Sequence, residues 1–321
     1  MGNDILVLAE HQAGSISDIT FELLGKAKDL ASASGGRAVV ALFGSAGLAS
    51  ELGAADLVLT VDDPALEHYT AEAYEKTLAH VVDEQQPRLV LLGTTTAGLD
   101  LAASLSQTWS APLVSYVVGL EHEGEALVAT AQIYGGKLMA EVALEGEHAI
   151  AAVTAGSFSG EAGRGVGSPA TESVSAPADL GAGLRTTFVE MIVPEAGDVD
   201  ITAAEMLVAV GRGIGSEGDV ELVQQLADAM GAPLAASRPV TDLGWLPKSR
   251  QVGKSGVKVK PRAYLMFGIS GAPEHLEGMR DAELIIACNT DAQAPIFDTA
   301  HYGTTADLFD LLPELTEKLG G

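Results

Sequence analysis

Short apolar runs alternate with amphipathic segments over residues 1–110, and this alternation constrains the fold more than any other feature of the chain. The apolar runs predict strands at 5–10, 37–44, 55–61 and 88–95, and the segments between them predict helices at 18–33 and 64–85. Runs that are apolar throughout are typical of strands buried on both faces. The pattern therefore predicts an α/β domain with a mostly parallel sheet.

The pattern changes after residue 121. Residues 126–144 and 148–154 have the apolar content of antiparallel strands, with a hairpin at Gly135 and Gly136. Residues 156–183 are rich in Gly, Ser, Ala and Pro and have no periodicity, which predicts a linker or a long surface crossing. A further strand is expected at 184–194.

A second α/β pattern follows this strand. It predicts a strand ending at Gly211, a helix at 220–230, strands at 263–269 and 283–290, and a last helix at 306–319. We therefore expect two domains, 1–193 and 194–321, each a mostly parallel sheet with flanking helices.

The charge of the chain excludes several classes of partner. The formal net charge is −26, which repels nucleic acid and anionic membrane, although composition leaves open whether the acidity is an adaptation to high salt. No apolar run approaches the length of about 18 residues that membrane insertion needs. The single cysteine, Cys288, excludes an intramolecular disulfide and favours a reducing, cytoplasmic location. Histidine and cysteine show no metal-ligand spacing.

One segment is basic in this acidic chain. No acidic residue lies between Asp242 and Glu274, whereas the segment contains Lys248, Arg250, Lys254, Lys258, Lys260 and Arg262. A cationic stretch that also contains glycines predicts an anion site. The alternative is a solvated loop that happens to be basic.

The sequence FGISGAPEH, residues 267–275, is the strongest single motif. A predicted strand stops at Gly268, Ser270 and Gly271 form a turn, and a helix is expected over 274–279 with His275 in its first turn. A helix N-terminus that begins with small residues suits an anion such as a pyrophosphate. Arg212 lies in a second glycine-rich turn, 211–215, whose spacing does not complete the GxGxxG fingerprint.

Further polar residues lie at predicted strand ends, where open α/β sheets bind their ligands. Ser237 and Arg238 follow one short strand, and Asn289 follows another. Asp307 precedes the last helix and suits either the adenosine end of a ligand or a helix N-cap. The segment 251–256, QVGKSG, lacks the complete GxxxxGK[ST] motif, so we reject a nucleotide triphosphatase. These positions predict a line of contacts of dinucleotide size.

Three segments carry a family resemblance. Residues 237–256, 264–279 and 288–315 resemble the FAD domain of the electron transfer flavoprotein alpha subunit family, and the resemblance extends more loosely over the N-terminal domain. It implies a Rossmann-like C-terminal domain that binds FAD and an N-terminal domain that docks on a beta subunit in a heterodimer. It also implies that electrons pass from acyl-CoA or other dehydrogenases to a quinone oxidoreductase or a similar acceptor. Whether the complex bifurcates electrons, and whether the beta subunit holds AMP or a second FAD, stays open.

The resemblance carries the cofactor-binding role onto residues that match the family motifs. Arg212 lies at the flavin side, Arg238 over the ring, Ser255 at flavin N5 and His275 near the pyrimidine edge. The expected FAD-binding residues are Arg212, Ser237, Arg238, Val252, Gly253, Lys254, Ser255, Ser270, Gly271, Ala272, Pro273, Glu274, His275, Asn289, Asp307 and Leu308. The chain departs from the family at Lys254, commonly Gln, at Pro273 and Glu274, often Ile-Gln, and at Val210, commonly Gly.

Two other functions are compatible with parts of the sequence. The first is a self-standing flavin- or nicotinamide-dependent reductase, although no acid–base pair lies beside the cofactor motifs. The second is a nucleotide-binding signalling module built on the N-terminal domain, whose strand-end turns FGSAG (43–47) and LGTTTAG (92–98) could cradle a nucleotide. Those turns are equally typical of ordinary strand ends. We therefore expect an electron carrier that is not itself an enzyme.

Overall fold

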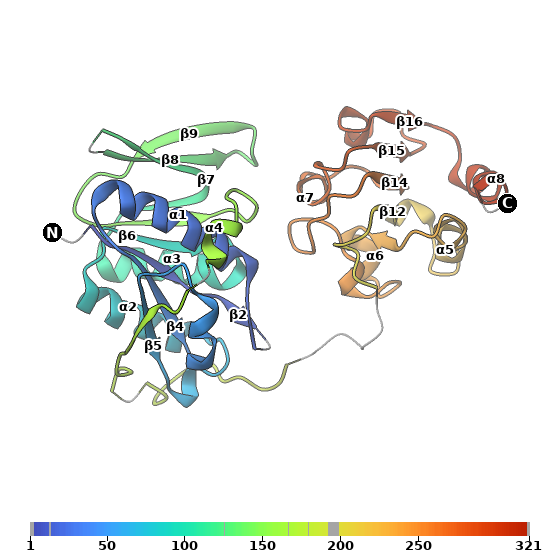
Figure 1. The fold of residues 1–321 in the computed structure, drawn as a ribbon. Helices are drawn as coiled ribbons and strands as arrows, with labels where there is room; N and C mark the ends of the chain where they lie inside the picture. Colours follow the sequence, from blue (N-terminus) through green and yellow to red (C-terminus); the bar gives the residue numbers. More distant parts are fainter. Residues whose placement is uncertain are drawn as a thin grey trace. The chain divides into compact units, whose positions relative to one another are not determined.

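The structure is a computed structural model that describes residues 3–319 except 13, 125, 166, 179 and 192–198. It divides into two compact units, Met1–Glu190 and Met191–Gly321, here called unit 1 and unit 2 (Figure 1). Each unit is built on one large sheet flanked by helices, so the predicted α/β class is confirmed. Among the described residues, no helix has the length and apolarity needed to cross a membrane.

The sheet of unit 1 has nine strands in the order β11-β5-β4-β1-β6-β10-β7-β8-β9. Neighbours from β11 to β7 are parallel, and β7, β8 and β9 are antiparallel. The strands are β1 (Ile5–Leu8), β4 (Ala38–Phe43), β5 (Leu57–Val61), β6 (Leu89–Gly93), β7 (Leu113–Glu123), β8 (Ala126–Ile133), β9 (Leu138–Ala143), β10 (Ala149–Val153) and β11 (Ala170–Ser173). A separate small hairpin pairs β2 (His11–Gln12) with β3 (Ser15–Ile16).

Helices cover both faces of this sheet because the central strands are apolar on both sides. Side chains of α1 (Asp18–Ser34) pack on one face, and side chains of α2 (Ala71–Gln85) and α3 (Thr96–Trp109) pack on the other. The helix expected over 64–85 is in fact two helices, the short η2 (Pro64–Leu66) and α2, with Thr70 at the N-cap of α2. Another short helix, η1 (Ala46–Glu51), follows β4.

Residues 126–154 confirm one expectation and correct another. β8 and β9 form the predicted antiparallel hairpin, with Gly135 and Gly136 at positive φ in its turn. The segment 148–154 was expected to be antiparallel, but β10 lies between β6 and β7 and is parallel to both. All of its side chains are buried, as in a central strand with helices on both faces.

The prediction of a linker at 156–183 is wrong. This segment contains α4 (Glu161–Arg164), which packs on α1, and β11, which extends the sheet beside β5. Its glycines serve close packing, since a Cβ at Gly163 would lie 1.8 Å from the carbonyl oxygen of Phe21. The strand expected at 184–194 is absent over 184–191, and 192–194 lie outside the described residues.

Unit 2 has a parallel five-stranded sheet in the order β13-β12-β14-β15-β16, the doubly wound order 2-1-3-4-5. The strands are β12 (Met206–Val210), β13 (Leu234–Ala236), β14 (Ala263–Phe267), β15 (Ile285–Cys288) and β16 (Tyr302–Thr304). The helices are η3 (Arg212–Ile214), α5 (Val220–Ala229), α6 (Arg238–Asp242), η4 (Lys248–Arg250), α7 (Pro273–Glu277), η5 (Pro295–Asp298) and α8 (Leu308–Leu319). Buried cores lie on both faces of this sheet.

Candidate functional site

The sheet order of unit 2 creates a crevice between β12 and β14, because the chain leaves these two strands toward opposite faces of the sheet. Gly211 and Gly213 follow β12, and Gly268 follows β14. A Cβ at Gly213 would lie 2.7 Å from the Cα of Gly268, which itself has a φ of +68°. Glycine at these positions therefore lets the two turns approach each other at the mouth of the crevice.

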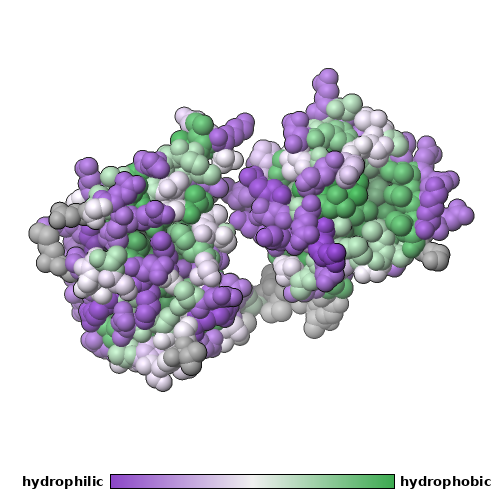
Figure 2. Space-filling model, turned by 45° about the horizontal axis from the view of Figure 1, so that its top comes forward, coloured by the Kyte–Doolittle hydropathy of each residue, from purple (hydrophilic) through white to green (hydrophobic). Residues whose placement is uncertain are grey.

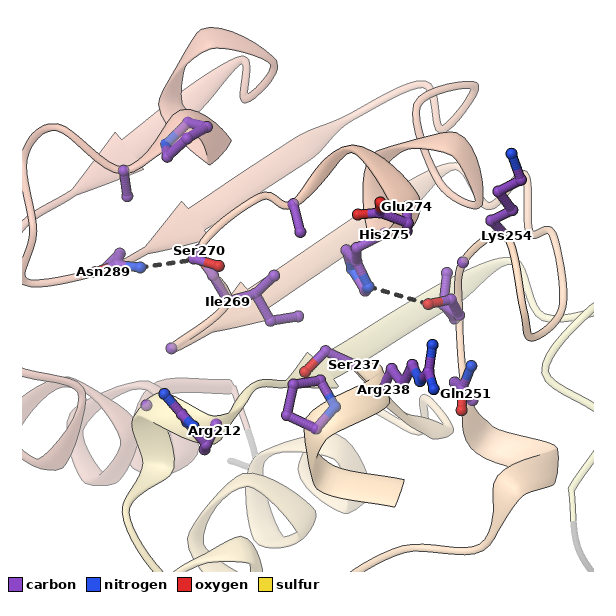
Figure 3. Close-up of a pocket in the computed structure, with 18 of the residues that line it drawn as sticks. Arg212, Ser237, Arg238, Gln251, Lys254, Ile269, Ser270, Glu274, His275 and Asn289 are labelled. Atoms are coloured by element: carbon purple, nitrogen blue, oxygen red, sulfur yellow. Dashed lines mark hydrogen bonds between the residues drawn. The ribbon is translucent and has the colours of Figure 1, made fainter. Parts of the chain in front are cut away.

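A pocket of about 800 Å³ lies at this edge of the sheet. Figure 3 shows Arg212, Ser237 and Arg238 across from Asn289, Ser270 and His275. The lining residues are Arg212, Gly213, Ser237, Arg238, Pro239, Gln251, Val252, Gly253, Lys254, Ser255, Gly268, Ile269, Ser270, Ala272, Glu274, His275, Asn289, Asp291, Ala294 and Pro295. The structure thus brings together all of the predicted site residues except Gly271, Pro273, Asp307 and Leu308.

Two of those four have structural roles beside the pocket. Gly271 has a φ of +86°, and a Cβ there would lie 2.3 Å from the backbone nitrogen of Ile296. Pro273 is the first residue of α7, which is shorter than the predicted helix and ends at Glu277. Both shape the turn of the FGISGAPEH motif without lining the pocket.

Asp307 and Leu308 line a second pocket of about 190 Å³. It shares Gly213, Gly268 and Asn289 with the larger pocket, so the two pockets adjoin. The Asp307 carboxylate also accepts a hydrogen bond of 2.9 Å from the backbone N–H of Phe309, as a residue that caps α8 does. The N-cap role of Asp307 is therefore confirmed, and its contact with the adenosine end of a ligand stays a prediction.

Several lining residues were not among those predicted from the sequence. Gly213 and Gly268 belong to the two predicted glycine-rich turns, and glycine at these strand ends was the available signal. Pro239, Ile269, Ala294 and Pro295 add apolar surface, and Gln251 adds a buried amide. Nothing in the local pattern distinguishes Gln251 from a solvated polar residue.

The pocket is lined by three cationic side chains, Arg212, Arg238 and Lys254, and by two carboxylates, Glu274 and Asp291. Arg238 forms an ion pair of 3.1 Å with Asp242 on α6. Within the described part of the chain, Arg212 has no carboxylate at ion-pair distance, so its charge can meet an anionic ligand.

The basic segment does not act as one anion site. Lys254 lines the pocket, whereas Arg250 donates to the carbonyl oxygen of Leu234 at 2.9 Å and Arg262 pairs with Glu205 at 3.7 Å. None of the other five cations of the segment, all within the described residues, lines the pocket. The cations of this segment are therefore spread over unit 2 and do not converge on one site.

His275 is buried in the pocket wall. Its Nδ1 lies 3.1 Å from the carbonyl oxygen of Val252 and must carry a hydrogen to bond there, because a carbonyl oxygen only accepts. Its Nε2 lies 3.3 Å from the hydroxyl oxygen of the fully buried Tyr264. Burial lowers the pKa of His275 to about 4, so the ring is neutral near pH 7.

In unit 1 the corresponding crevice, between β1 and β6, contains the side chain of Glu10. The hydroxyl of Thr95 donates to Glu10 at 2.9 Å and accepts the backbone N–H of Gly98 at 2.9 Å, which caps α3. A Cβ at Gly93 would lie 2.8 Å from the Glu10 carboxylate. Burial raises the pKa of Glu10. The turn 92–98 thus has a structural role, and the geometry gives no support to a nucleotide module in unit 1.

Unit 2 has the fold and the strand-end pocket of a dinucleotide-binding α/β protein. Family models agree: residues 5–179 match the electron transfer flavoprotein domain, and residues 200–280 match the electron transfer flavoprotein FAD-binding domain. The chain belongs to the electron transfer flavoprotein alpha subunit family. It is therefore an electron carrier rather than an enzyme, and its cofactor is FAD.

Curated relatives match over nearly the full chain. The electron transfer flavoprotein subunit alpha of Methylophilus methylotrophus is 35% identical over 98% of both chains. Protein FixB of Clostridium saccharobutylicum is 37% identical over 97% of this chain and 94% of its own. Lactate dehydrogenase (NAD(+),ferredoxin) subunit LctC of Acetobacterium woodii is 33% identical over 99% of this chain and 77% of its own.

The residues present fit FAD. The two pockets adjoin, and the glycines that they share let a ligand approach the backbone. Within the described residues, the backbone N–H of Ser270, which lines the pocket, donates no hydrogen bond to the protein and is available to an anion. Apolar side chains such as Val252 and Ile269 suit a flat ring.

Proposed function

We propose that unit 2 holds FAD in the two adjoining pockets and that the predicted site residues bind it. The observation that carries this proposal is the convergence of distant sequence motifs on one pocket at the switch point of the sheet. Arg212 and Arg238 supply positive charge, and Asn289, Asp307 and Leu308 surround the smaller, adenosine end. FAD supplies the redox chemistry, while the protein positions it and sets its electrostatic surroundings.

We further propose that the chain works in a heterodimer with a beta subunit that docks on unit 1. Exposed apolar residues on the β8–β9 hairpin, among them Tyr134, Leu138 and Met139, support a partner on this unit. A relative from Anaerotignum propionicum, 35% identical, is named as the electron transfer subunit beta of acryloyl-CoA reductase and is thus part of a larger complex. The buried thiol of Cys288 supports a reducing, cytoplasmic location.

The proposed reaction partners are an acyl-CoA or similar dehydrogenase as donor and a quinone oxidoreductase or similar acceptor. Stopped-flow spectroscopy of the FAD-loaded heterodimer tests this. We expect bleaching of the flavin bands only when a dehydrogenase and its substrate are both present, and recovery on adding the acceptor. Turnover of a small substrate by the heterodimer alone would instead establish a self-standing reductase. Adding NAD⁺ and ferredoxin together tests for electron bifurcation, as the name of the Acetobacterium relative suggests.

A further inference from the structure

Gln251 is a polar side chain that lies almost wholly inside the pocket wall. It is 1% exposed and lies between α6, which carries Arg238, and the loop 252–257, which carries Ser255. Its backbone is also tied down, since its N–H donates to the carbonyl oxygen of Lys248 at 3.0 Å and its own carbonyl oxygen accepts from Val257 at 2.8 Å. A buried amide of this kind must satisfy its hydrogen bonds within the protein.

The side-chain amide of Gln251 has one partner on each side. Its Nε2 donates to the hydroxyl oxygen of Ser255 at 2.9 Å, and its Oε1 accepts from the hydroxyl of Thr241 at 2.8 Å (Figure 3 labels Gln251 among the residues that line the pocket). An amide nitrogen only donates, so Ser255 acts as the acceptor in the first bond. The hydrogen of the Ser255 hydroxyl is then left for another partner.

We propose that Gln251 is a positioning residue that directs the hydroxyl hydrogen of Ser255 to an acceptor atom of the cofactor. This inference rests on the proposed function, because it assumes that FAD occupies the pocket. It adds a role for Gln251 that acts through Ser255.

The direction of the Ser255 hydroxyl depends on this amide because the rest of the loop leaves it free to rotate. The loop backbone is held by the N–H of Lys254, which donates to the carbonyl oxygen of Glu274 at 2.7 Å, whereas the Ser255 side chain is exposed. If the Gln251 amide were reversed, its oxygen would accept the Ser255 hydrogen and withdraw it from the pocket. The Thr241 hydroxyl has one hydrogen and two acceptors within reach, the amide oxygen at 2.8 Å and the carbonyl oxygen of Arg238 at 3.0 Å. Donation to the nearer amide oxygen favours the first orientation.

A double-mutant cycle on the FAD-loaded heterodimer tests the proposal. Gln251→Leu, Ser255→Ala and the double variant are compared for FAD affinity and for the ¹⁵N chemical shifts of isotopically labelled FAD, which report hydrogen bonds accepted by the ring. Losing one directed hydrogen bond should weaken binding about tenfold in either single variant. The double variant should bind no more weakly than Ser255→Ala alone, and all three should show the same ¹⁵N shift.

Controls separate this role from a general loss of structure. Gln224→Leu, on the surface of α5 and outside the pocket, should leave affinity and ¹⁵N shifts unchanged. If Gln251→Leu does not fold, Thr241→Val tests the same orientation from the other side and should change the ¹⁵N shift in the direction of Ser255→Ala. Additive losses in the double variant, or wild-type ¹⁵N shifts in Gln251→Leu and Thr241→Val, would overturn the proposal. Absence of FAD from the wild-type protein would instead overturn the proposed function.

Discussion

At the scale of single residues, burial fixes both the orientation and the protonation state of the His275 ring. Both ring nitrogens face groups of the protein, Val252 and Tyr264, so the side chain is held in place before any ligand binds. The sequence places His275 in the cofactor motif, and the structure places it in the pocket wall. Its buried hydrogen-bond partners could not be predicted, because Val252 and Tyr264 lie 23 and 11 residues away along the chain.

The low pKa of His275 makes the stability of unit 2 depend on pH. The folded protein does not take up this proton until about pH 4, whereas an unfolded histidine takes it up near pH 6.5. The unfolded state therefore binds more protons in this window, and the free energy of unfolding should fall by up to about 2–3 kcal/mol as the pH drops from 6.5 to 4.

Urea unfolding at pH 7.5 and pH 4.5 measures this decline, and it should be shallower in His275→Gln. His80→Gln, on the partly exposed surface of α2, should decline like the wild type. Equal declines in His275→Gln and the wild type would show that His275 is not buried as described.

Gln251 shows the limit of sequence analysis at this scale. The loop QVGKSG was singled out for its glycines and its hydroxyl, and Ser255 does line the pocket. Gln251 belongs to the same motif, but its importance follows from burial and from Thr241, ten residues away. Such partners are brought together by packing and carry no periodic signal.

At the scale of elements, the positions of strands and helices with strong periodicity were predictable. Which strands pair, and in which direction, was less predictable. β1, β4, β5 and β6 lie where continuous apolar runs predicted them. The pairing of β10 was not predictable, because an apolar run does not reveal whether its neighbours run parallel or antiparallel. The glycine-rich segment 156–183 was mistaken for a linker because glycine serves both flexible chains and close helix contacts.

The variant Gly163→Ala tests whether the segment 156–183 packs on α1. In Gly163→Ala the new methyl group must displace the backbone of α1 at Phe21, so α4 can no longer pack as closely. We expect a loss of about 3 kcal/mol, which lowers the melting temperature of unit 1 by about 10 °C.

The matched variant Gly47→Ala in η1 meets no atom within 4 Å and should change the melting temperature little. Calorimetry of the two variants measures the difference. If Gly163→Ala melts like the wild type, the segment does not pack on α1.

At the scale of the whole molecule, the surface combines high negative charge with local apolar areas. Figure 2 shows that hydrophilic side chains predominate, with smaller hydrophobic areas on both units. On the β8–β9 hairpin, Tyr134 is 77% exposed, Leu138 55% and Met139 57%. Exposed apolar groups of this kind favour association with a partner.

We expect the chain without a beta subunit to self-associate through this hairpin. Leu138→Ser should shift the lone chain toward the monomer in sedimentation velocity and weaken binding of the beta subunit. Leu243→Ser, at a residue of similar exposure in unit 2, should do neither. A monodisperse wild-type monomer, or equal effects of the two variants, would contradict the docking role of the hairpin.

The central claim is that FAD occupies the pocket of unit 2, and flavin occupancy of the purified heterodimer tests it most directly. Ala272 is exposed and lines the pocket, so Ala272→Trp should fill part of it without disturbing the core, whereas Ala203→Trp adds the same ring at an exposed position outside it. We predict that Ala272→Trp loses one FAD per heterodimer relative to the wild type and to Ala203→Trp, with unchanged circular dichroism. A wild-type protein without flavin, or an Ala272→Trp protein with full flavin occupancy, would contradict the claim.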